Sequence, residues 1–152
     1  MDLKEQYDRL LRYCYMKTKD RSLAEDIVQE TFLKFWQSHS YEDTGKEMAY
    51  LYTIGRNLCM DAFRTRKFLN IEDYPEQESV RNSEPEQQLD QIAIEMALDA
   101  LPDELQEIVV MRYVSEMSSA DIGKVLGMSR FSVNRRLKEG LSLLKKALGG
   151  ER

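Results

Sequence analysis

The sequence predicts an all-α protein made of two small helical domains joined by a flexible linker. Three observations predict it. Apolar residues recur at spacings of three and four along most of the chain, which is the period of an amphipathic helix. The period-two alternation and the Asn-Gly or Asp-Gly turns that indicate strands and hairpins do not occur. Prolines and acidic residues gather in residues 68–90, so the predicted domains are residues 1–67 and 91–152.

The first domain is predicted to hold three or more helices. The apolar stripe of the first helix is Leu3, Tyr7, Leu10, Leu11, Cys14 and Thr18. A second helix is predicted over residues 22–37, where Ser22 caps the start and Glu25 closes a capping box. A polar loop over residues 39–46 precedes a third helix, which buries Leu51, Ile54, Leu58 and Ala62. Its opposite face is polar and basic and carries Thr53, Arg56, Asn57, Met60, Arg64 and Lys67.

The second domain is predicted to end in a helix-turn-helix. A helix over residues 91–100 stops before Pro102, and Asp103 and Glu104 then lie in the first turn of the next helix, where the helix dipole favours carboxylates. The inner stripe of that helix is Leu105, Ile108, Val109 and Arg112. A short helix over residues 119–126 ends at Gly127, and Ser129 caps a last helix that runs to about residue 148. The predicted buried stripe of the last helix is Val133, Leu137, Leu141, Leu144 and Leu148.

Charge is distributed unevenly along the chain. The net charge is -5 and the isoelectric point about 5.1, which by itself argues against a simple basic nucleic-acid coat. Residues 68–90 hold one arginine against seven acidic residues, too polar to bury the area that would offset the entropy of ordering, so they are predicted to be an extended or disordered linker. Residues 112–146 hold eight basic and three acidic residues. The helix-turn-helix is therefore locally cationic.

The last helix has the side chains of a DNA-reading helix at its N-terminal end. These are Arg130, Ser132, Asn134, Arg135 and Arg136. Such groups reach base edges when a helix enters the major groove, while neighbouring Lys or Arg pairs with phosphates. The alternative is a solvated cationic face on an ordinary helical bundle. Phe131 is open to two readings, contact with a thymine methyl group or local packing.

The third helix combines aromatic and cationic residues. Tyr41, Tyr50, Tyr52 and Phe63 lie close in sequence to Arg56, Asn57, Arg64, Arg66 and Lys67. This combination suits unpaired bases, which stack on rings while their phosphates are neutralised. Aromatic residues on helices more often belong to the core, which is the alternative. The acidic and amide side chains of Asp26, Gln29 and Glu30 are either a solvated patch or a surface for a basic partner.

Two sets of motifs, in order, resemble a known family. The runs Asp26-Ile27-Val28-Gln29-Glu30-Thr31-Phe32-Leu33-Lys34-Phe35-Trp36 and Tyr50-Leu51-Tyr52-Thr53-Ile54-Gly55-Arg56-Asn57-Leu58-Cys59-Met60-Asp61, with Arg64 and Arg66, resemble region 2 of bacterial sigma factors. Leu101-Pro102, Tyr113, Asp121-Ile122-Gly123, Leu126-Gly127-Met128-Ser129 and Val133-Asn134-Arg135-Arg136-Leu137 resemble region 4. The order and size are similar to the extracytoplasmic-function group of the sigma-70 family.

The resemblance implies a transcription initiation factor that binds core RNA polymerase and directs it to promoter DNA. By position, Asp26, Gln29 and Glu30 match the surface for the clamp helices of polymerase. Residues 39–46 with Arg56, Asn57, Met60, Arg64 and Lys67 match the part that melts and reads the minus-ten element. Arg130, Ser132, Asn134, Arg135, Arg136, Lys138 and Glu139 match the helix that reads the minus-thirty-five element. The linker would follow the RNA exit path, and an anti-sigma factor is the expected regulatory partner.

Some positions depart from the family pattern. Tyr50 stands where tryptophan is frequent and Gly55 where alanine is frequent, which affects packing more than role. The Glu-Ile-Ala run that often opens the helix-turn-helix is Asp121-Ile122-Gly123, a mild change. In the recognition helix, the common Gly-Thr-Val-Lys-Ser-Arg run is replaced from Phe131 to Arg136. The promoter sequence therefore cannot be carried over from the family.

Other function classes are less favoured. No catalytic constellation, glycine-rich phosphate loop or cofactor motif is present, and His39 lies in a polar loop, so the chain is not expected to be an enzyme. Two cysteines and one histidine give no metal-site spacing. We expect no membrane insertion and a cytoplasmic location. The alternative function is a helix-turn-helix transcriptional regulator that binds DNA as a dimer without polymerase.

Overall fold

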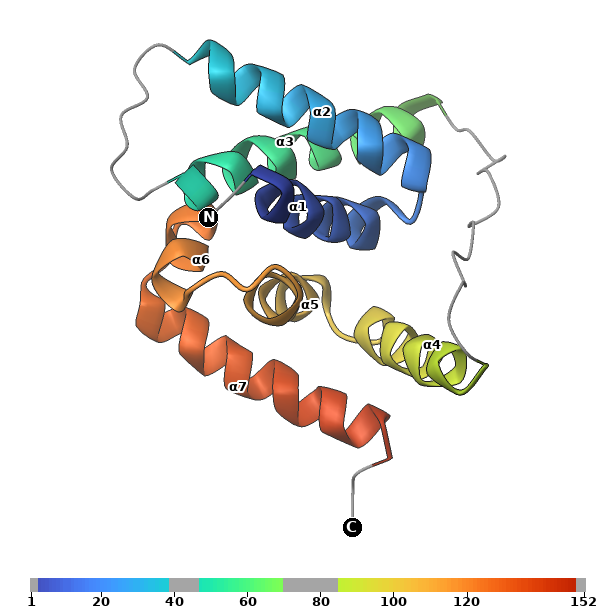
Figure 1. Cartoon of the computed structure of the whole chain (residues 1–152). Coiled ribbons are helices and arrows are strands. Elements are labelled where there is room, and N and C mark those ends of the chain that lie inside the picture. Colours follow the sequence, from blue (N-terminus) through green and yellow to red (C-terminus); the bar gives the residue numbers. More distant parts are fainter. Residues whose placement is uncertain (1–2, 39–46, 70–84, 150–152) are drawn as a thin grey trace.

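A computed structural model describes residues 3–38, 47–69 and 85–149 (Figure 1). Helices account for nearly all of these residues, and no strand occurs among them, so the predicted all-α class is confirmed. In chain order the elements are α1 (Leu3–Thr18), α2 (Arg21–Gln37), α3 (Glu47–Leu69), α4 (Pro85–Asp99), α5 (Asp103–Val109), the π-helical segment η1 (Val110–Val114), α6 (Ser119–Leu126) and α7 (Arg130–Ala147). The predicted loop over residues 39–46 and most of the predicted linker lie outside the described residues.

The first three helices form one module around a shared core. Tyr13 and Cys14 of α1, Val28 of α2, and Leu51 and Tyr52 of α3 are almost completely buried. The predicted cap at Ser22 is wrong. Asp20 is the residue that caps α2, because its carboxylate accepts the Leu23 backbone N–H at 3.1 Å. The other oxygen of the same carboxylate pairs with Arg66 of α3 at 2.5 Å, so the start of α2 is also joined to the end of α3.

The buried side of α3 differs from the predicted one. Ala49, Leu51, Tyr52, Gly55 and Cys59 are the buried residues, whereas the predicted Ile54, Leu58 and Ala62 are only partly buried. α3 packs against α1 and α2, and it also contacts α6 of the second module. A helix that packs against several neighbours buries a wider part of its surface than one apolar stripe. The middle of that buried part need not coincide with the middle of the apolar stripe.

The second module is built around α5 and α7. α4 begins at Pro85, six residues before the predicted start, with proline at a position that helix starts tolerate well. Asp103 and Glu104 occupy the first turn of α5 as predicted. Leu105, Ile108 and Val109 are buried as predicted, and α5 packs against α7. In Figure 1, α5 is seen nearly end-on between α1 and α7.

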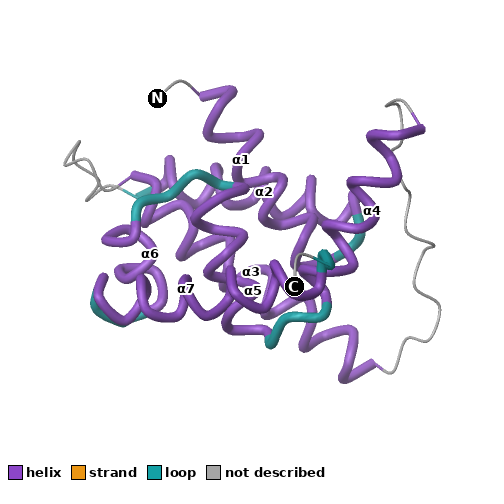
Figure 2. Tube along the Cα trace, turned by 90° about the horizontal axis from the view of Figure 1, so that it is seen from below, coloured by secondary structure: helices purple, strands orange, loops and turns teal. Residues whose placement is uncertain are grey.

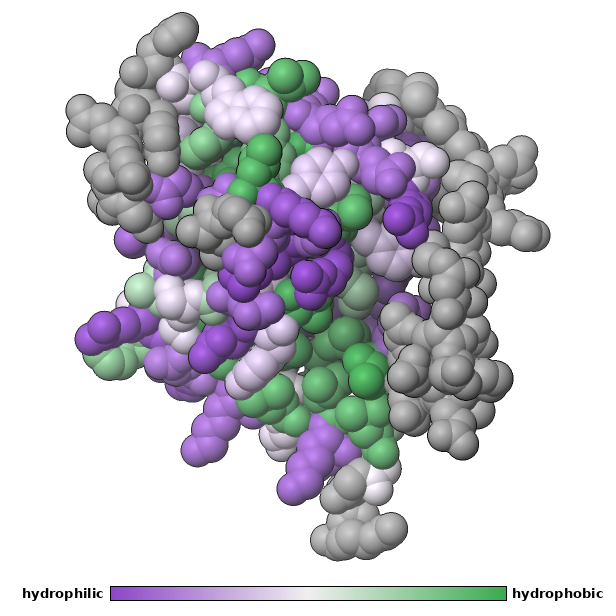
Figure 3. Space-filling model, in the orientation of Figure 1, coloured by the Kyte–Doolittle hydropathy of each residue, from purple (hydrophilic) through white to green (hydrophobic). Residues whose placement is uncertain are grey.

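The apolar stripe of α7 is buried only over its first half. Val133 and Leu137 are buried, but Leu141 and Leu148 are 36% and 47% exposed. The prediction for these two leucines is wrong for the described residues, because the end of α7 runs past α5 toward α4, which it contacts only sparsely. Figure 3 shows the apolar surface that remains there. Met96 of α4 is also exposed.

The two modules pack against each other. Buried apolar residues of both modules form one continuous cluster, and α3 contacts α6 while α1 contacts η1. Seen from below in Figure 2, α6 and α4 of the second module lie on opposite sides of the molecule. Ion pairs also join the modules, among them Arg9 with Glu116 at 3.2 Å and Lys19 with Asp99 at 2.9 Å. The two modules are therefore docked on each other through both apolar contacts and ion pairs.

Candidate functional site

The turn between α6 and α7 has the geometry of a helix-turn-helix. α6 ends at Gly127, whose φ of 72° and ψ of 37° are left-handed and suit glycine. Ser129 then caps α7 by accepting the Ser132 backbone N–H at 3.1 Å. Both features are as the sequence predicts. Gly123 fits closely beneath the turn, since a Cβ there would lie 2.4 Å from the Met128 carbonyl oxygen. The N-terminal end of α7 is thereby held at a fixed angle to α6.

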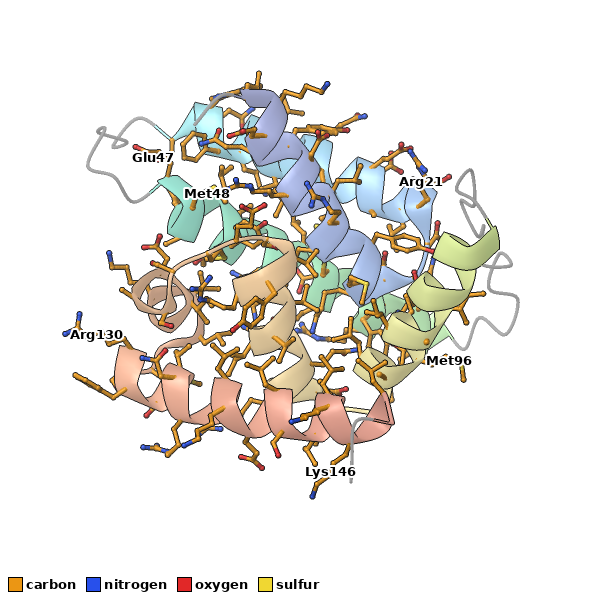
Figure 4. The ribbon with its side chains drawn as sticks, turned by 60° about the horizontal axis from the view of Figure 1, so that its bottom comes forward. Arg21, Glu47, Met48, Met96, Arg130 and Lys146 are labelled. Carbon is orange, nitrogen blue, oxygen red and sulfur yellow. The ribbon has the colours of Figure 1, made fainter. Side chains whose placement is uncertain are left out.

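The side chains predicted to read DNA lie mainly on the open side of α7. Arg130, Asn134, Arg135, Lys138 and Glu139 are exposed, and Ser132 is half-buried. Figure 4 shows Arg130 at one end of α7 and Lys146 at the other, both directed away from the bundle. Phe131 is 67% exposed, and the Arg130 guanidinium carbon lies 5.1 Å from the centre of its ring. Local packing in the core does not explain Phe131.

Two of these residues also have partners on other helices of the second module. Asn134 accepts a hydrogen bond from the Ser119 hydroxyl at 2.5 Å, which ties α7 to the start of α6. The guanidinium of Arg136 forms an ion pair with Glu104 of α5, and its Nε atom is buried without a hydrogen-bond partner. Arg136 is thus directed partly toward α5, unlike Arg135, which is exposed and bonded only locally to the Ser132 hydroxyl at 3.3 Å.

On α3, the five predicted DNA-binding residues are separated into two groups. Asn57, Met60, Arg64 and Lys67 are exposed. Within the described part of the chain, Arg64 is joined only to Asp61 on the same helix, at 3.5 Å. Arg56 is 28% exposed and faces the second module, where its Nε donates to the Glu107 carboxylate at 2.7 Å. Four of the five residues therefore lie together on an exposed surface, and the fifth, Arg56, forms an ion pair with Glu107 of the second module.

Glu107 of α5 is the one charged residue that is buried among the residues the structure describes. Its side chain is 7% exposed, and one carboxylate oxygen accepts from the Tyr13 hydroxyl at 2.6 Å and from Arg56. The Lys17 ammonium lies 3.7 Å from the same oxygen. Burial alone would raise the pKa of this carboxyl, but the hydrogen bond from Arg56, the Lys17 charge and the Tyr13 hydroxyl outweigh it and lower the pKa below its usual 4.5.

Sequence reasoning missed Glu107, Tyr13 and Lys17. A sequence signal did exist, because Glu107 directly precedes an apolar run that begins at Ile108 and must be partly buried with it. Its partners, however, come from α1 and α3, and no local pattern identifies them. The interaction joins residues 51 and 94 positions apart.

The aromatic residues do not all lie where a stacking surface needs them. Tyr52 is fully buried and packs edge-on against Tyr13, with 5.3 Å between ring centres. It belongs to the core, so its candidacy for base stacking is wrong. Tyr50 is 37% exposed and packs against Phe35, and Phe63 is 65% exposed. Tyr41 lies outside the described residues.

The acidic and amide patch on α2 is open. Asp26, Gln29 and Glu30 are exposed on the side opposite the buried Ile27 and Thr31. Exposed Leu33 and Trp36 continue the same face toward the end of the helix. Because these positions are three or four residues apart, they form one continuous surface of mixed polar and apolar character. Glu30 makes a long ion pair, 3.9 Å to Lys34.

The described residues contain no group of three or more His, Cys, Asp and Glu side chains that could hold a metal ion. None of the described helices is long and apolar enough to cross a membrane. His39 lies outside the part of the chain that the structure describes. The candidate surfaces are therefore open faces of helices, on α2, α3 and α7.

The sequence is similar to families and proteins of known function. Residues 3–68 match the family model for sigma-70 region 2, and residues 91–144 match the model for sigma-70 region 4. The chain is 32% identical to the extracytoplasmic-function RNA polymerase sigma factor SigL of Mycobacterium tuberculosis, with 91% of this chain and 82% of that protein covered. It is 27% identical to the corresponding factor SigW of Bacillus subtilis, with 93% and 83% covered.

Two solved structures share the fold. The sigma factor RpoE in complex with the anti-sigma factor NepR, from Bartonella quintana, aligns with a TM-score of 0.79 at 22% identity, and 99% of this chain and 96% of that chain are covered. CnrH in complex with the cytosolic domain of CnrY aligns with a TM-score of 0.69 at 21% identity, and 95% and 82% are covered. The arrangement of the helices is therefore shared over nearly the whole chain.

Proposed function

The chain belongs to the extracytoplasmic-function group of the sigma-70 family of RNA polymerase sigma factors, and from this premise we propose how its surfaces divide the work. A sigma factor supports promoter recognition and transcription initiation by RNA polymerase. The observation that carries the proposal is the pair of region matches in the family's order, together with a helix-turn-helix whose exposed helix is basic. We assign residues 1–67 and 91–152 to the two functional domains and residues 68–90 to the linker.

The α2 surface is proposed to bind core polymerase. Asp26, Gln29 and Glu30 are exposed together, and their carboxylate and amide groups suit a basic partner. The apolar Leu33 and Trp36 beside them add area that is desolvated on binding. This pairing of an apolar contact with a polar rim is typical of specific protein interfaces.

The α3 and α7 surfaces are proposed to bind promoter DNA. On α3, Asn57, Met60, Arg64 and Lys67, with Arg56 once it is released, would hold the minus-ten strand. On α7, the minus-thirty-five element would be read by Arg130, Ser132, Asn134, Arg135, Arg136, Lys138 and Glu139. Arg135 is the strongest candidate for direct base readout, because its guanidinium is exposed near the N-terminal end of the helix.

The proposed partners are core RNA polymerase, promoter DNA and an anti-sigma factor. The last follows from the two solved structures, both of which are complexes of sigma factors with anti-sigma partners. We place the chain in the cytoplasm, where polymerase and promoters are. Its sigma-factor relatives are not enzymes in the usual sense, and we propose that polymerase supplies all of the catalysis.

Run-off transcription with core polymerase on a promoter library tests the proposal. Adding the chain should produce initiation at specific promoters. The Asp26→Lys variant should lose co-purification with core while its circular dichroism spectrum stays unchanged. A chain that binds DNA as a dimer, is not recovered with core polymerase and gives no initiation would instead be a polymerase-independent regulator.

Two variants of α7 separate base readout from general attraction. Arg135→Ala should cost about 1 to 3 kcal/mol at one promoter position, as expected for the loss of a base contact. Lys146→Ala removes an exposed charge at the other end of α7 and should weaken binding to all sequences alike. Equal losses at every promoter for both variants would rule out direct readout by Arg135.

A further inference from the structure

We propose that a hydrogen bond from the Ser119 hydroxyl fixes the orientation of the Asn134 carboxamide, so that Asn134 presents only donors to DNA and selects guanine over adenine at one base pair. The inference rests on the proposed role of α7 in reading the minus-thirty-five element, and it names one base that α7 would read. Ser119 would then be a positioning residue for specificity, although it belongs to α6 and not to the reading helix.

The two side chains meet where the start of α6 approaches the first part of α7. Ser119 begins α6, and Asn134 follows the first turn of α7. The two helices pack against each other there, as Figure 1 shows. The Ser119 hydroxyl donates to Oδ1 of Asn134 at 2.5 Å, a short bond of the O–H···O kind. Asn134 is exposed and Ser119 is half-buried, so the bond lies at the edge of the open face of α7.

The surroundings of Oδ1 favour an oxygen over an amide nitrogen at that position. The Ser119 hydroxyl proton needs an acceptor, which the carboxamide oxygen provides. Oδ1 also lies at the N-terminal end of α6, where backbone N–H groups without helical partners and the helix dipole give a positive potential. Turning the carboxamide over would place its NH2 group against this positive end. The oxygen of Asn134 is therefore held toward α6, and Nδ2 has no acceptor among the residues that the structure describes.

A carboxamide held in this way does not have the usual match of asparagine to adenine. That match uses both groups, because the NH2 group donates to N7 of adenine while the oxygen accepts from the N6 amino group. With the oxygen of Asn134 turned toward Ser119, only the N–H donors of Nδ2 remain for a base. Guanine offers the acceptors N7 and O6 in the major groove, whereas adenine has one acceptor beside a donor. Guanine is therefore the base that a donor-only side chain fits.

The neighbours of Asn134 on α7 suggest a division of roles. Arg130 and Lys138 lie four residues before and after it, so the three exposed side chains form one row along the helix. The two long cations can pair with phosphates, which attracts DNA of any sequence. Asn134 is short and uncharged, so it adds nothing to this general attraction. Its contribution to binding should therefore be almost entirely a preference among bases.

Four variants of the full-length chain test the inference. Ser119→Ala removes the hydroxyl that orients the carboxamide, and Asn134→Ala removes the carboxamide itself. Ser119→Thr keeps a hydroxyl and should keep the wild-type preference. Ser118→Ala is the matched control, because the Ser118 hydroxyl also lies at the start of α6 but accepts the Asp121 backbone N–H at 3.1 Å. Circular dichroism confirms that each variant is folded.

Binding to DNA is measured for the complex of the full-length chain with core polymerase. The probes are duplexes of the promoter on which the wild-type chain is most active in the run-off library, with each base pair of the minus-thirty-five element changed in turn to the other three. At one of these pairs the wild type should prefer guanine to adenine about tenfold, as expected for a matched base contact. Asn134→Ala should remove the preference at this pair alone and leave the salt dependence of binding unchanged.

The role of Ser119 is measured at the same base pair. Ser119→Ala should reduce the ratio of guanine to adenine binding about threefold or more, because the released carboxamide can offer its oxygen to adenine. In the Asn134→Ala background, Ser119→Ala should have no further effect on this ratio. The Ser118→Ala control should leave the ratio unchanged. 7-Deazaguanine, which has C–H in place of N7, should weaken the binding of the wild type and not that of Asn134→Ala.

The outcomes separate this inference from the proposed function. A wild-type preference for adenine at the pair that depends on Asn134 would overturn it, because the carboxamide would then have the opposite orientation. So would a ratio that Ser119→Ala leaves unchanged or that Ser118→Ala lowers equally, or the absence of any base pair that depends on Asn134. If the wild-type chain gives no promoter-specific initiation with core, the proposed function fails. The bases that the free chain and its variants select from a random-sequence duplex pool then decide separately whether Asn134 selects guanine.

Discussion

Gly123→Ala is expected to destabilise the protein, although alanine forms helices better than glycine does. Gly123 lies inside α6, where alanine normally stabilises by about 1 kcal/mol relative to glycine. The family pattern, which often has alanine at this position, points the same way. The structure predicts the opposite sign, because the added Cβ would lie 2.4 Å from the Met128 carbonyl oxygen.

The magnitude follows from what has to move. The Met128 carbonyl is backbone, so it cannot rotate away as the end of a side chain would. The backbone N–H of Met128 donates to the Gly123 carbonyl at 2.9 Å, and the next residue, Ser129, caps α7. Overpacking of this kind costs about 1–3 kcal/mol, which exceeds the ~1 kcal/mol gained from helix propensity. A net loss of about 1 kcal/mol lowers Tm by roughly 2–4 °C in a chain of this size.

Thermal unfolding followed by circular dichroism measures this difference, with Gly55→Ala as the matched control. Gly55 is also buried in a helix at a position where the family often has alanine. The atom nearest to its added Cβ is the end of the Leu10 side chain, at 3.1 Å, which can shift. Gly55→Ala should therefore be neutral or stabilising. If Gly123→Ala raises Tm as much as Gly55→Ala does, the close approach beneath the turn is not real and the reasoning is refuted.

Three further predictions concern single side chains. Phe131→Ala should change the stability by no more than about 0.5 kcal/mol, because the ring is exposed, yet weaken binding at promoters with thymine opposite it; replacing that thymine by uracil in the wild-type complex should have the same effect. Because the pKa of Glu107 is lowered below its usual 4.5, the stability that its charge gives to the folded chain should be fully present above that pH and be lost as the pH falls further, a change visible in thermal unfolding and absent in Glu107→Gln. The hydrogen bond to Cys59 and burial raise the pKa of the Cys14 thiol, so its alkylation by iodoacetamide at pH 8 should be slow in the folded chain and become fast in denaturant; fast reaction without denaturant would contradict the burial.

Much of the fold was predictable because its signals are local. The left-handed Gly127 and the cap Ser129 depend on residues within one turn, and both are as predicted. Ser22 illustrates the limit of such signals. It was predicted to cap α2, but Asp20 does so, because its carboxylate can cap the helix and also meet Arg66 from α3. A tertiary contact decided between two chemically suitable caps.

The candidate site was predictable where it depends on one helix and not where it depends on two. The exposed side of α7 follows from helical periodicity, and Arg135 and Lys138 lie on it. The engagement of Arg56 by Glu107 depends on how the modules dock, which no spacing within α3 or α5 reveals. The burial of Tyr52 depends likewise on Tyr13 of another helix. The spacing of residues within one helix carries no information about which distant helix packs against it.

The buried carboxylate that contacts the first module and the side chains proposed to choose the promoter stand on different helices, α5 and α7. An engineer of synthetic gene circuits can therefore exchange outward residues of α7 such as Arg135 and Lys138 for another target sequence without altering the contacts of Glu107 with α1 and α3.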